Sequence, residues 1–265
     1  MFEAVQADTP EKQRKAFQLR YQVYCVERNF LDPADNPDGL ERDEYDDHAV
    51  QGVLSDRETG ITVGTVRLVM HKRGARHGCL PIHKLCQDPL VHRRDVLPLE
   101  TTCELSRFAI SKELRRRVTD DGGREAGPCE VEMATRPWLP HITLGLIAVA
   151  LQMGLAHRVD NVCAIMEPSL LRLVARLGFH FEPVGPLIPY HGWRQPCYAP
   201  ARTLCERVAV EHPAIWKIIT NESRLPSPHC GEFDDRIPRR PISIGTSSLR
   251  RNAAGDLADV AEKAA

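Results

Sequence analysis

The alternation of apolar and polar positions predicts β-structure in the first half of the chain. Residues 48–54 (HAVQGVL) and 61–70 (ITVGTVRLVM) are two largely apolar runs, and the polar turn SDRETG between them ends in glycine. This arrangement is typical of a β-hairpin. Residues 101–111 (TTCELSRFAIS) predict a further strand, and residues 180–200 read as strands and loops separated by prolines.

Helical patterns flank and follow these strands. Thr9-Pro10-Glu11 predicts a helix start, with a capping hydroxyl, proline in the first turn and an acid near the positive end of the helix dipole. The apolar run 142–156 predicts a buried helix that is too short to span a bilayer. After a strand at 159–166, residues 167–179 predict an amphipathic helix that ends at Gly178.

The order hairpin, strand, helix, strand, helix, strand predicts an α/β fold with a mixed sheet. We expect one domain over residues 1–210. Residues 71–98 read as an irregular connection and 112–117 (KELRRR) as a short basic helix. Residues 211–265 are expected to hold a small helix at 211–220 and then an extended or disordered tail, which is rich in proline, serine and arginine.

Composition narrows the classes of function. The chain has 265 residues and a formal net charge of −1, so no global field recruits nucleic acid or an anionic membrane. The first 15 residues lack the apolar core of a signal peptide, which favours a cytoplasmic location with its nine cysteines reduced. The spacing of His77, Cys79, His83 and Cys86 fits no zinc template, so no metal is expected.

An acidic cluster before the hairpin predicts a buried ionic network. Residues 41–47 contain five carboxylates, and Arg67 lies in the apolar run that follows. A desolvated guanidinium needs a carboxylate partner, because an unpaired buried charge is very costly. Arg20 and Arg107 are two further arginines in apolar surroundings. A network of this kind can be purely structural, and that alternative stays open.

Glu104 and Arg107 form a second group of interest. Positions three apart on a regular strand face opposite sides, so both side chains could line one cavity only if the strand bulges near Leu105 and Ser106. Otherwise the two side chains have different roles. Cys103 lacks a neighbouring base that would activate it as a nucleophile. Neither GxxxxGK[ST] nor GxGxxG occurs, so nucleotide binding is not supported.

Four segments together resemble one family. LRYQVYCVERNF, ERDEYDDH, GTVRLV and ELSRFAIS match in order and separation the autoinducer synthase-like branch of the GNAT acyltransferases, which contains acyl-homoserine lactone synthases and long-chain N-acyl amino acid synthases. Over residues 8–205, including MEPSLLRLVARLGFHFEPVGPLIPYHGWRQPC, the chain is similar to acyltransferases associated with PEP-CTERM/exosortase systems. The resemblance implies catalytic roles for Glu104, Ser106 and Arg107. It implies substrate binding by Arg20, Tyr24, Phe30, Glu41, Asp43, Asp46, Arg67 and Phe108.

The resemblance also implies a fold and a reaction. The fold would be a single GNAT-like domain, with a twisted mixed sheet whose central strands splay apart to admit a pantetheine arm. The donor would be an acyl-acyl carrier protein, the acceptor a small amine, and Glu104 the general base, with no further cofactor. Arg107 or Arg67 would be an alternative partner for an acceptor carboxylate. The usual pyrophosphate loop is not recognisable, which disfavours CoA, and a lipid-like product would favour peripheral membrane association.

Two other functions remain open. An acyl-homoserine lactone synthase would use S-adenosylmethionine as acceptor, but Tyr24 and Phe30 stand where lactone synthases usually have Phe and Trp. A non-catalytic protein that binds acyl chains or carrier protein would have kept the fold without the chemistry. The presence of Glu104, Ser106 and Arg107 argues against this last function.

Overall fold

The computed structural model describes residues 2–72, 74, 79–113 and 139–223. The backbone contacts divide the chain into residues 1–227 and 228–265, and the second unit lies outside the described residues. The sheet follows the order β1-β2-β3-β4-β5-β8-β6, and β7 pairs with β8. Its strands are β1 (Phe2–Gln6), β2 (Ala49–Asp56), β3 (Thr62–Val69), β4 (Thr102–Ile110), β5 (Asn161–Met166), β6 (Glu182–Pro183), β7 (Ile188–Pro189) and β8 (Trp193–Pro200).

Six α-helices and several shorter helical turns surround this sheet in the described part of the chain. The α-helices are α1 (Pro10–Tyr21), α2 (Pro81–Leu85), α5 (Leu139–Ala156), α6 (Pro168–Arg176), α7 (Ala201–Glu211) and α8 (Pro213–Ser223). A π-helix, Gln22–Glu27, continues α1, and 3-10 turns occupy Pro33–Asp35, Asp46–His48, Pro89–His92 and Leu99–Thr101. No helix of the described residues combines the length and hydropathy needed to cross a membrane.

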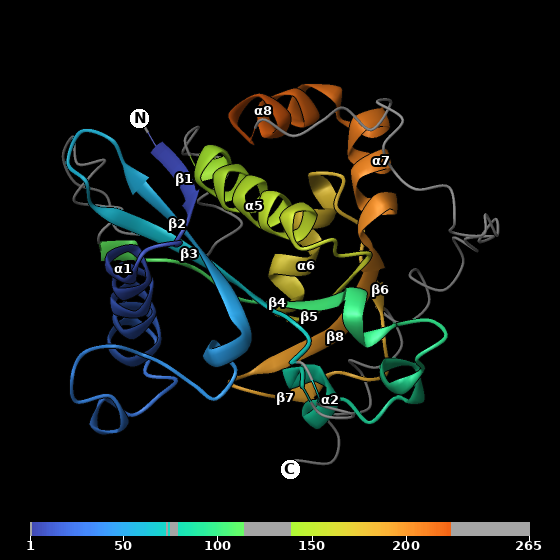
Figure 1. Cartoon of the computed structure of the whole chain (residues 1–265), viewed down its shortest axis with the longest axis horizontal. Helices are drawn as coiled ribbons and strands as arrows, with labels where there is room; N and C mark the ends of the chain where they lie inside the picture. The colour runs from blue at the N-terminus through green and yellow to red at the C-terminus, as the bar shows by residue number, and fades with distance from the viewer. Residues whose placement is uncertain (1, 73, 75–78, 114–138, 224–265) are drawn as a thin grey trace, which may run out of the picture. The chain divides into compact units, whose positions relative to one another are not determined.

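Helices cover both faces of the sheet. Along β2, Leu54 packs in the cluster that contains α5, whereas its neighbour Val53 packs with Ala16 of α1. Because successive strand residues point to opposite faces, α5 and α1 lie on opposite sides of the sheet. Figure 1 shows α5 (yellow-green) crossing one side of the sheet and α1 (dark blue) on the other. A second core cluster joins α5 with α6, α7 and α8, and it includes Ile219 of α8.

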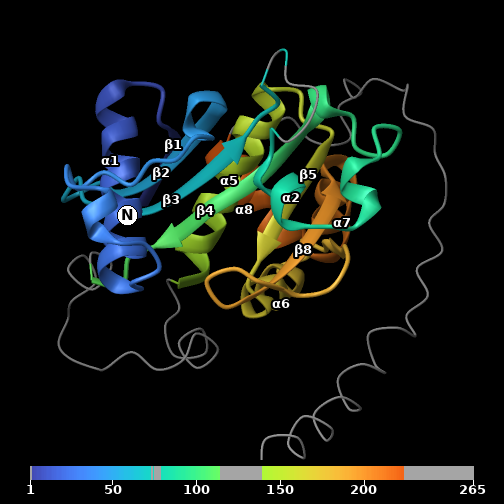
Figure 2. The ribbon, with the colours of Figure 1, turned by 90° about the horizontal axis from the view of Figure 1, so that it is seen from below.

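The two central strands, β4 and β5, separate partway along their length. β4 and β5 pair in parallel only from Thr102 with Asn161 to Leu105 with Ala164. Beyond that point β4 continues along β3, while β5 continues along β8. Figure 2 shows β4 and β5 side by side with α2 beside them. The mixed sheet with splayed central strands that the family resemblance implies is confirmed.

Most predicted elements are confirmed, and three were missed. The hairpin, the strands at β4 and β5, and the helices α1, α5 and α6 lie where the sequence predicts them, and α8 overlaps the small helix expected at 211–220. Strand β1 and helix α7 were not predicted, and residues 71–98 contain the short helix α2. Beyond residue 113 the expected basic helix lies outside the described residues, as does the expected tail. Nothing tests the domain boundary expected at residue 210, so it stays a prediction. Ile219, which lies beyond that boundary, packs in the core.

Close approach of α5 to the sheet predicts opposite effects for two glycines of that helix. A Cβ at Gly145 would lie 2.4 Å from Leu54 Cδ1 in the core, whereas at Gly154 the nearest atom is 3.8 Å away. Gly145→Ala should lower the free energy of unfolding by about 1–3 kcal/mol through overpacking. Gly154→Ala, the control, should be neutral or raise it by up to about 1 kcal/mol, because glycine weakens a helix interior. Urea denaturation measures both, and equal effects would contradict the close packing.

Candidate active site

A cavity of about 240 Å³ lies where β4 and β5 separate. The wall from β4 is continuous from Glu104 to Ile110, and β5 with the start of α6 supplies the opposite wall from Ile165 to Leu170. The rest of the lining comes from the π-helix after α1 and the loop that follows it, the acidic loop, β3, α2 and the β7–β8 hairpin. These segments contribute Val23, Tyr24, Arg28, Phe30, Leu31, Asp43, Tyr45, Arg67, Pro81, Leu85, Tyr190, His191 and Arg194. The cavity thus draws on segments from both ends of the described chain.

An ionic network underlies one side of this cavity. The Arg20 guanidinium, fully buried, donates to Glu41 at 2.5 Å and to both oxygens of Asp46 at 2.7 and 2.9 Å. Arg67 donates to Asp43 at 2.6 Å and to Asp46 at 2.9 Å. The network predicted from the sequence is confirmed for these residues.

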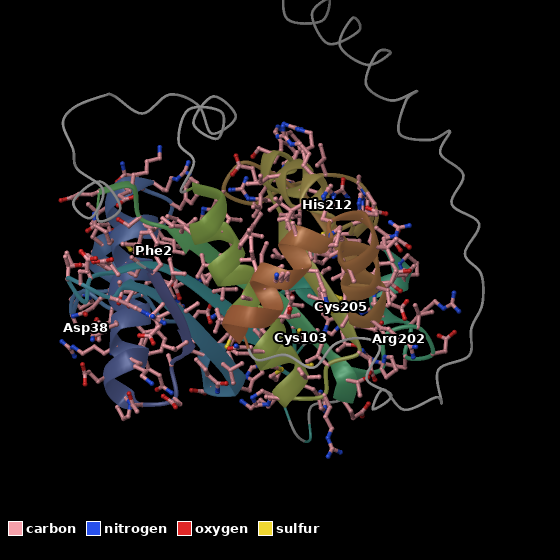
Figure 3. The ribbon with its side chains drawn as sticks, turned by 90° about the horizontal axis from the view of Figure 1, so that it is seen from above. Phe2, Asp38, Cys103, Arg202, Cys205 and His212 are labelled. Atoms are coloured by element: carbon pink, nitrogen blue, oxygen red, sulfur yellow. The ribbon has the colours of Figure 1, made fainter. Side chains whose placement is uncertain are left out.

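Arg107 closes the network from β4. Its guanidinium donates to both oxygens of Glu41, at 3.0 and 2.8 Å, and to Asp43 at 3.0 Å. Three arginines therefore meet three carboxylates, and their formal charges cancel. The other acids of the cluster, Asp38, Glu44 and Asp47, are solvent-exposed, and Figure 3 labels Asp38 at the outer edge of the molecule.

A bulge in β4 brings Arg107 to this network. Thr65 pairs with Ala109 and Arg67 with Ser106, so Arg107 and Phe108 together oppose the single residue between Thr65 and Arg67. Arg107 has φ +50°, a left-handed conformation that is uncommon for a residue with a side chain. Glu104 and Arg107 consequently line the same cavity, as the sequence predicted for a bulged strand. The bulge lies one residue beyond Ser106.

Glu104 has surroundings unlike those of the network carboxylates. It lines the cavity but is only 2% exposed, and the Ile82 N–H of α2 donates to its Oε2 at 2.6 Å. Burial raises the pKa of Glu104 to about 8, although this N–H and the charges of Arg67 and Arg107 act to lower it. By contrast, the pKa of Glu41 is about 2, because hydrogen bonds and charge from Arg107 and Arg20 outweigh its burial. A carboxyl group with a pKa near neutrality is suited to proton transfer.

Ser106 is oriented by the same network. The Arg67 Nε donates to Ser106 Oγ at 3.0 Å, and Ser106 lines the cavity two residues after Glu104. Because this hydroxyl oxygen accepts the arginine proton, its own O–H is left as a donor. The cavity therefore contains a proton acceptor, Glu104, and a hydroxyl donor, Ser106, on one strand.

Aromatic rings form the wall that faces the network. The Tyr24 and Phe30 rings lie 6.5 Å apart, and His191 stacks on Phe30 at 5.5 Å. The Arg107 guanidinium lies 5.2 Å from the Tyr24 ring, and that of Arg194 lies 5.8 Å from the Phe30 ring. These contacts link the β7–β8 hairpin to the bulge of β4.

The structure divides the predicted site residues into two groups. Tyr24, Phe30, Asp43, Arg67, Glu104, Ser106, Arg107 and Phe108 line the cavity. Arg20, Glu41 and Asp46 do not line it, and they lie behind its wall as partners of the arginines. Substrate contact was predicted for those three, whereas their observed contacts are to the network. The assignment of catalytic and binding roles stays a prediction.

Sequence reasoning missed the residues that come from distant segments. Tyr45 lies inside the acidic motif and Tyr190–Arg194 inside the longer segment that carries the resemblance, but neither was assigned to the site. The α2 helix with its N–H to Glu104 carries no motif that marks it. Cys103 lies beneath the helices that cover the sheet (Figure 3), and burial raises the pKa of its thiol to about 12. Among the described residues no group of three or more His, Cys, Asp or Glu side chains has the arrangement of a metal site. Of the four residues whose spacing was compared with zinc sites, His77 lies outside the described residues.

Asp46→Asn should destabilise the fold strongly. Asp46 is 8% exposed and accepts hydrogen bonds from Arg20, Arg67 and Gln51, so its neutralisation leaves two buried arginines short of charge. Breaking a buried pair from one side costs about 3–5 kcal/mol of unfolding free energy. Asp47→Asn is the matched control, since Asp47 is exposed, and should change stability by at most about 0.5 kcal/mol. Urea denaturation compares the two, and an Asp46→Asn protein as stable as the control would contradict the network.

The network also predicts how stability depends on pH. The pKa of Glu41 falls from an ordinary 4.5 to about 2 on folding. A lowered carboxyl pKa contributes stability that is fully present above pH 4.5 and is lost as the pH falls through about 2. Unfolding free energies measured from neutral pH downward should therefore begin to fall near pH 4.5. A flat profile down to about pH 3 would be incompatible with this ion pairing.

Comparisons with known proteins agree with this fold. Residues 19–122 match the model of an acetyltransferase (GNAT) domain. A search of curated proteins gives no match. Among solved structures, TofI in a ternary complex with an inhibitor and MTA is 18% identical, with a TM-score of 0.54 over 80% of this chain and 99% of TofI.

Two further structures share the arrangement. BjaI, described as a CoA-dependent acyl-homoserine lactone synthase with SAM and isopentyl-CoA, is 20% identical, with a TM-score of 0.54 over 86% of this chain and 90% of BjaI. FeeM, an N-acyl amino acid synthase from uncultured soil microbes, is 15% identical, with a TM-score of 0.50 over 80% of this chain and 96% of FeeM. At these identities the likeness establishes the fold. The domain match over residues 19–122 and the shared arrangement together show a GNAT-like fold and support acyl transfer as the activity.

Proposed function

We propose that the chain is an N-acyltransferase that moves a long-chain fatty acyl group from an acyl-acyl carrier protein thioester to the amine of a small acceptor such as an amino acid. It requires no further cofactor. The observation that carries this proposal is Glu104, a buried carboxyl group with a pKa of about 8, at the cavity between the splayed strands. Arginines lower the pKa of Glu41 and of Asp46, so these two stay ionised, whereas the raised pKa of Glu104 suits it to exchange a proton with substrate.

The reaction follows from the chemistry of a thioester. Glu104 in its carboxylate form takes a proton from the acceptor ammonium, and the neutral amine attacks the acyl carbonyl carbon. A C–N bond forms, the C–S bond breaks, and the sulfur leaves as a thiolate that takes up the proton lost by the attacking nitrogen, which gives the thiol and the neutral amide. Ser106, whose oxygen is occupied by Arg67 Nε, donates its hydroxyl proton toward the oxygen or sulfur that becomes negative. No enzyme nucleophile is required.

The splayed strands supply the donor site. Beyond Leu105 the edge of β4 that faced β5 has lost its partner strand, so backbone N–H groups on that edge are available to stabilise an oxyanion. One such donor contributes about 3 kcal/mol in other acyl transfers. Leu105, Phe108, Ile165, Met166 and Leu170 add apolar surface to the same cavity. This surface suits an acyl chain, which binds by burying methylene groups.

The carrier-protein donor and the cellular setting rest mainly on the sequence resemblance. Arg172 and Arg176 lie on α6, whose Leu170 lines the cavity, and they would suit an acidic carrier protein through salt-sensitive steering. At a second basic cluster, Arg93 and Arg94, the Arg93 side chain is paired with Asp95, so this cluster offers less positive charge to a carrier protein. An association with PEP-CTERM/exosortase systems is part of the proposal and is supported by residues 8–205 alone.

The decisive assay mixes the protein with long-chain acyl-carrier protein and a panel of amines, with product detection by mass spectrometry. We expect an acyl amide and free carrier-protein thiol. Acylation of S-adenosylmethionine with release of methylthioadenosine would instead establish a lactone synthase. Absence of any acyl amide with carrier-protein and CoA donors alike would leave the non-catalytic binding function.

Glu104→Gln should lower kcat/KM by about 100- to 10,000-fold, the usual contribution of a general base. Glutamine keeps an acceptor for the Ile82 N–H, so the protein should still fold. In the parent, kcat/KM should rise with pH through about 8, because the base acts when deprotonated and burial raises its pKa. Glu104→Gln should lose that inflection, whereas Glu100→Gln, an exposed control, should keep both rate and profile. An unchanged profile in Glu104→Gln would remove Glu104 from the mechanism.

A further inference from the structure

Two arginines on the cavity wall differ from those of the network. Arg28 and Arg194 line the cavity, and neither forms an ion pair with any carboxylate of the described residues. Arg67 and Arg107, in contrast, are engaged by the acidic loop through three carboxylates. An acceptor carboxylate at Arg67 or Arg107 would have to displace one of those partners, so these two arginines are poor candidates for holding it.

The charged side chains that line the cavity outside the network, including Arg28 and Arg194, sum to a positive charge. The network is neutral, and Glu104 is largely protonated below its pKa of about 8. Glu167 also lines the cavity but pairs with neither Arg28 nor Arg194 in the described part of the chain. With Glu104 protonated, one negative and two positive side chains remain, for a net formal charge of about +1. The carboxylate form of Glu104, which takes up the ammonium proton, adds a negative charge at its own part of the wall. An anion of low charge is the complementary ligand.

Arg194 is held in place while most of its donors stay available. Its Nη1 donates to the Trp193 carbonyl oxygen at 3.1 Å, and its guanidinium lies 5.8 Å from the Phe30 ring. A guanidinium has five N–H donors in a planar fork that matches a carboxylate. His191, which stacks on Phe30, has its pKa lowered by burial and then by Arg107 and Arg194, so all three belong to one electrostatic neighbourhood.

We infer that Arg194, assisted by Arg28, binds a carboxylate of the acceptor and so selects acceptors that carry an amine and a carboxylate on one small molecule. This inference rests on the proposed N-acyltransferase function and names the residues that hold the carboxylate of its amino acid acceptor. Arg194 and Glu104 line the same cavity of about 240 Å³, which is large enough for an acceptor of amino acid size. Glu104 receives the ammonium proton at one part of the wall, and Arg194 holds the carboxylate at another.

The donor offers a second anion, the phosphodiester of the phosphopantetheine arm. In the donor this phosphate is separated from the thioester by the whole pantetheine chain, whereas an acceptor carboxylate travels with the reacting amine. A cavity of this volume that contains Glu104 and Arg194 together therefore favours the carboxylate. Acyl-pantetheine, which lacks the phosphate, separates the two sources by experiment.

The test compares a free amino acid with its carboxamide as acceptors, each with acyl-carrier protein and with acyl-pantetheine as donor. Arg194→Gln should lower kcat/KM for the amino acid by about 10-fold or more with both donors, the size expected for one lost charge-assisted hydrogen bond. For the carboxamide it should change little. Arg14→Gln, an exposed arginine on α1, is the matched control, and thermal unfolding verifies that each variant is folded.

Three outcomes would overturn the inference. Equal loss with amino acid and carboxamide would make Arg194 structural, and an unchanged preference for the amino acid would place the carboxylate elsewhere. A loss seen only with acyl-carrier protein would assign Arg194 to the donor phosphate. In each case acyl amide is still formed by the parent protein, so the proposed function survives. If the parent acylates neither acceptor from either donor, the proposed function itself fails.

Discussion

The neutral network of Arg20, Arg67 and Arg107 with Glu41, Asp43 and Asp46 is the interaction on which the rest of the structure depends. It joins α1, the acidic loop, β3 and the bulge of β4, which are otherwise separate in sequence. Burial of so many charges is favourable only when every one has its partners, since an unpaired charge in the interior costs several kcal/mol. The network therefore specifies one arrangement of these four segments.

Two buried glutamates of this protein have pKa values shifted in opposite directions. Glu41 lies against two guanidinium groups and its pKa falls to about 2, whereas Glu104 has a backbone N–H as its close donor and its pKa rises to about 8. Both are buried, so the difference comes from the distance to positive charge rather than from exposure. Separation of an ionised structural set from a titratable group in one cavity is typical of sites that transfer protons.

Local patterns predicted the parts of the fold that local physics determines. The hairpin, the capped first helix and the buried apolar helix follow from periodicity and turn residues. The bulge was one of two alternatives that the spacing of Glu104 and Arg107 left open. The ionic partners followed from the cost of burying Arg67. The hairpin residue Arg194 and the α2 contact to Glu104 depend on long-range packing, so no local signal marks them. Strand β1 pairs only with β2, and its short, mixed sequence gives little periodicity.

The two walls of the cavity are stabilised by different interactions, ionic contacts on one and apolar contacts on the other. They should therefore differ in how readily they accept substitutions. On the β4 wall, Ser106 and Arg107 are tied to the ionic network, so a change at either one disturbs several partners at once. On the opposite wall, Ile165, Met166 and Leu170 contribute apolar contacts that tolerate exchange for side chains of similar volume. Substitutions are therefore expected to accumulate on the wall formed by β5 and the start of α6. A lineage of such proteins can change the acyl chain that it accepts while the proton-transfer apparatus stays fixed.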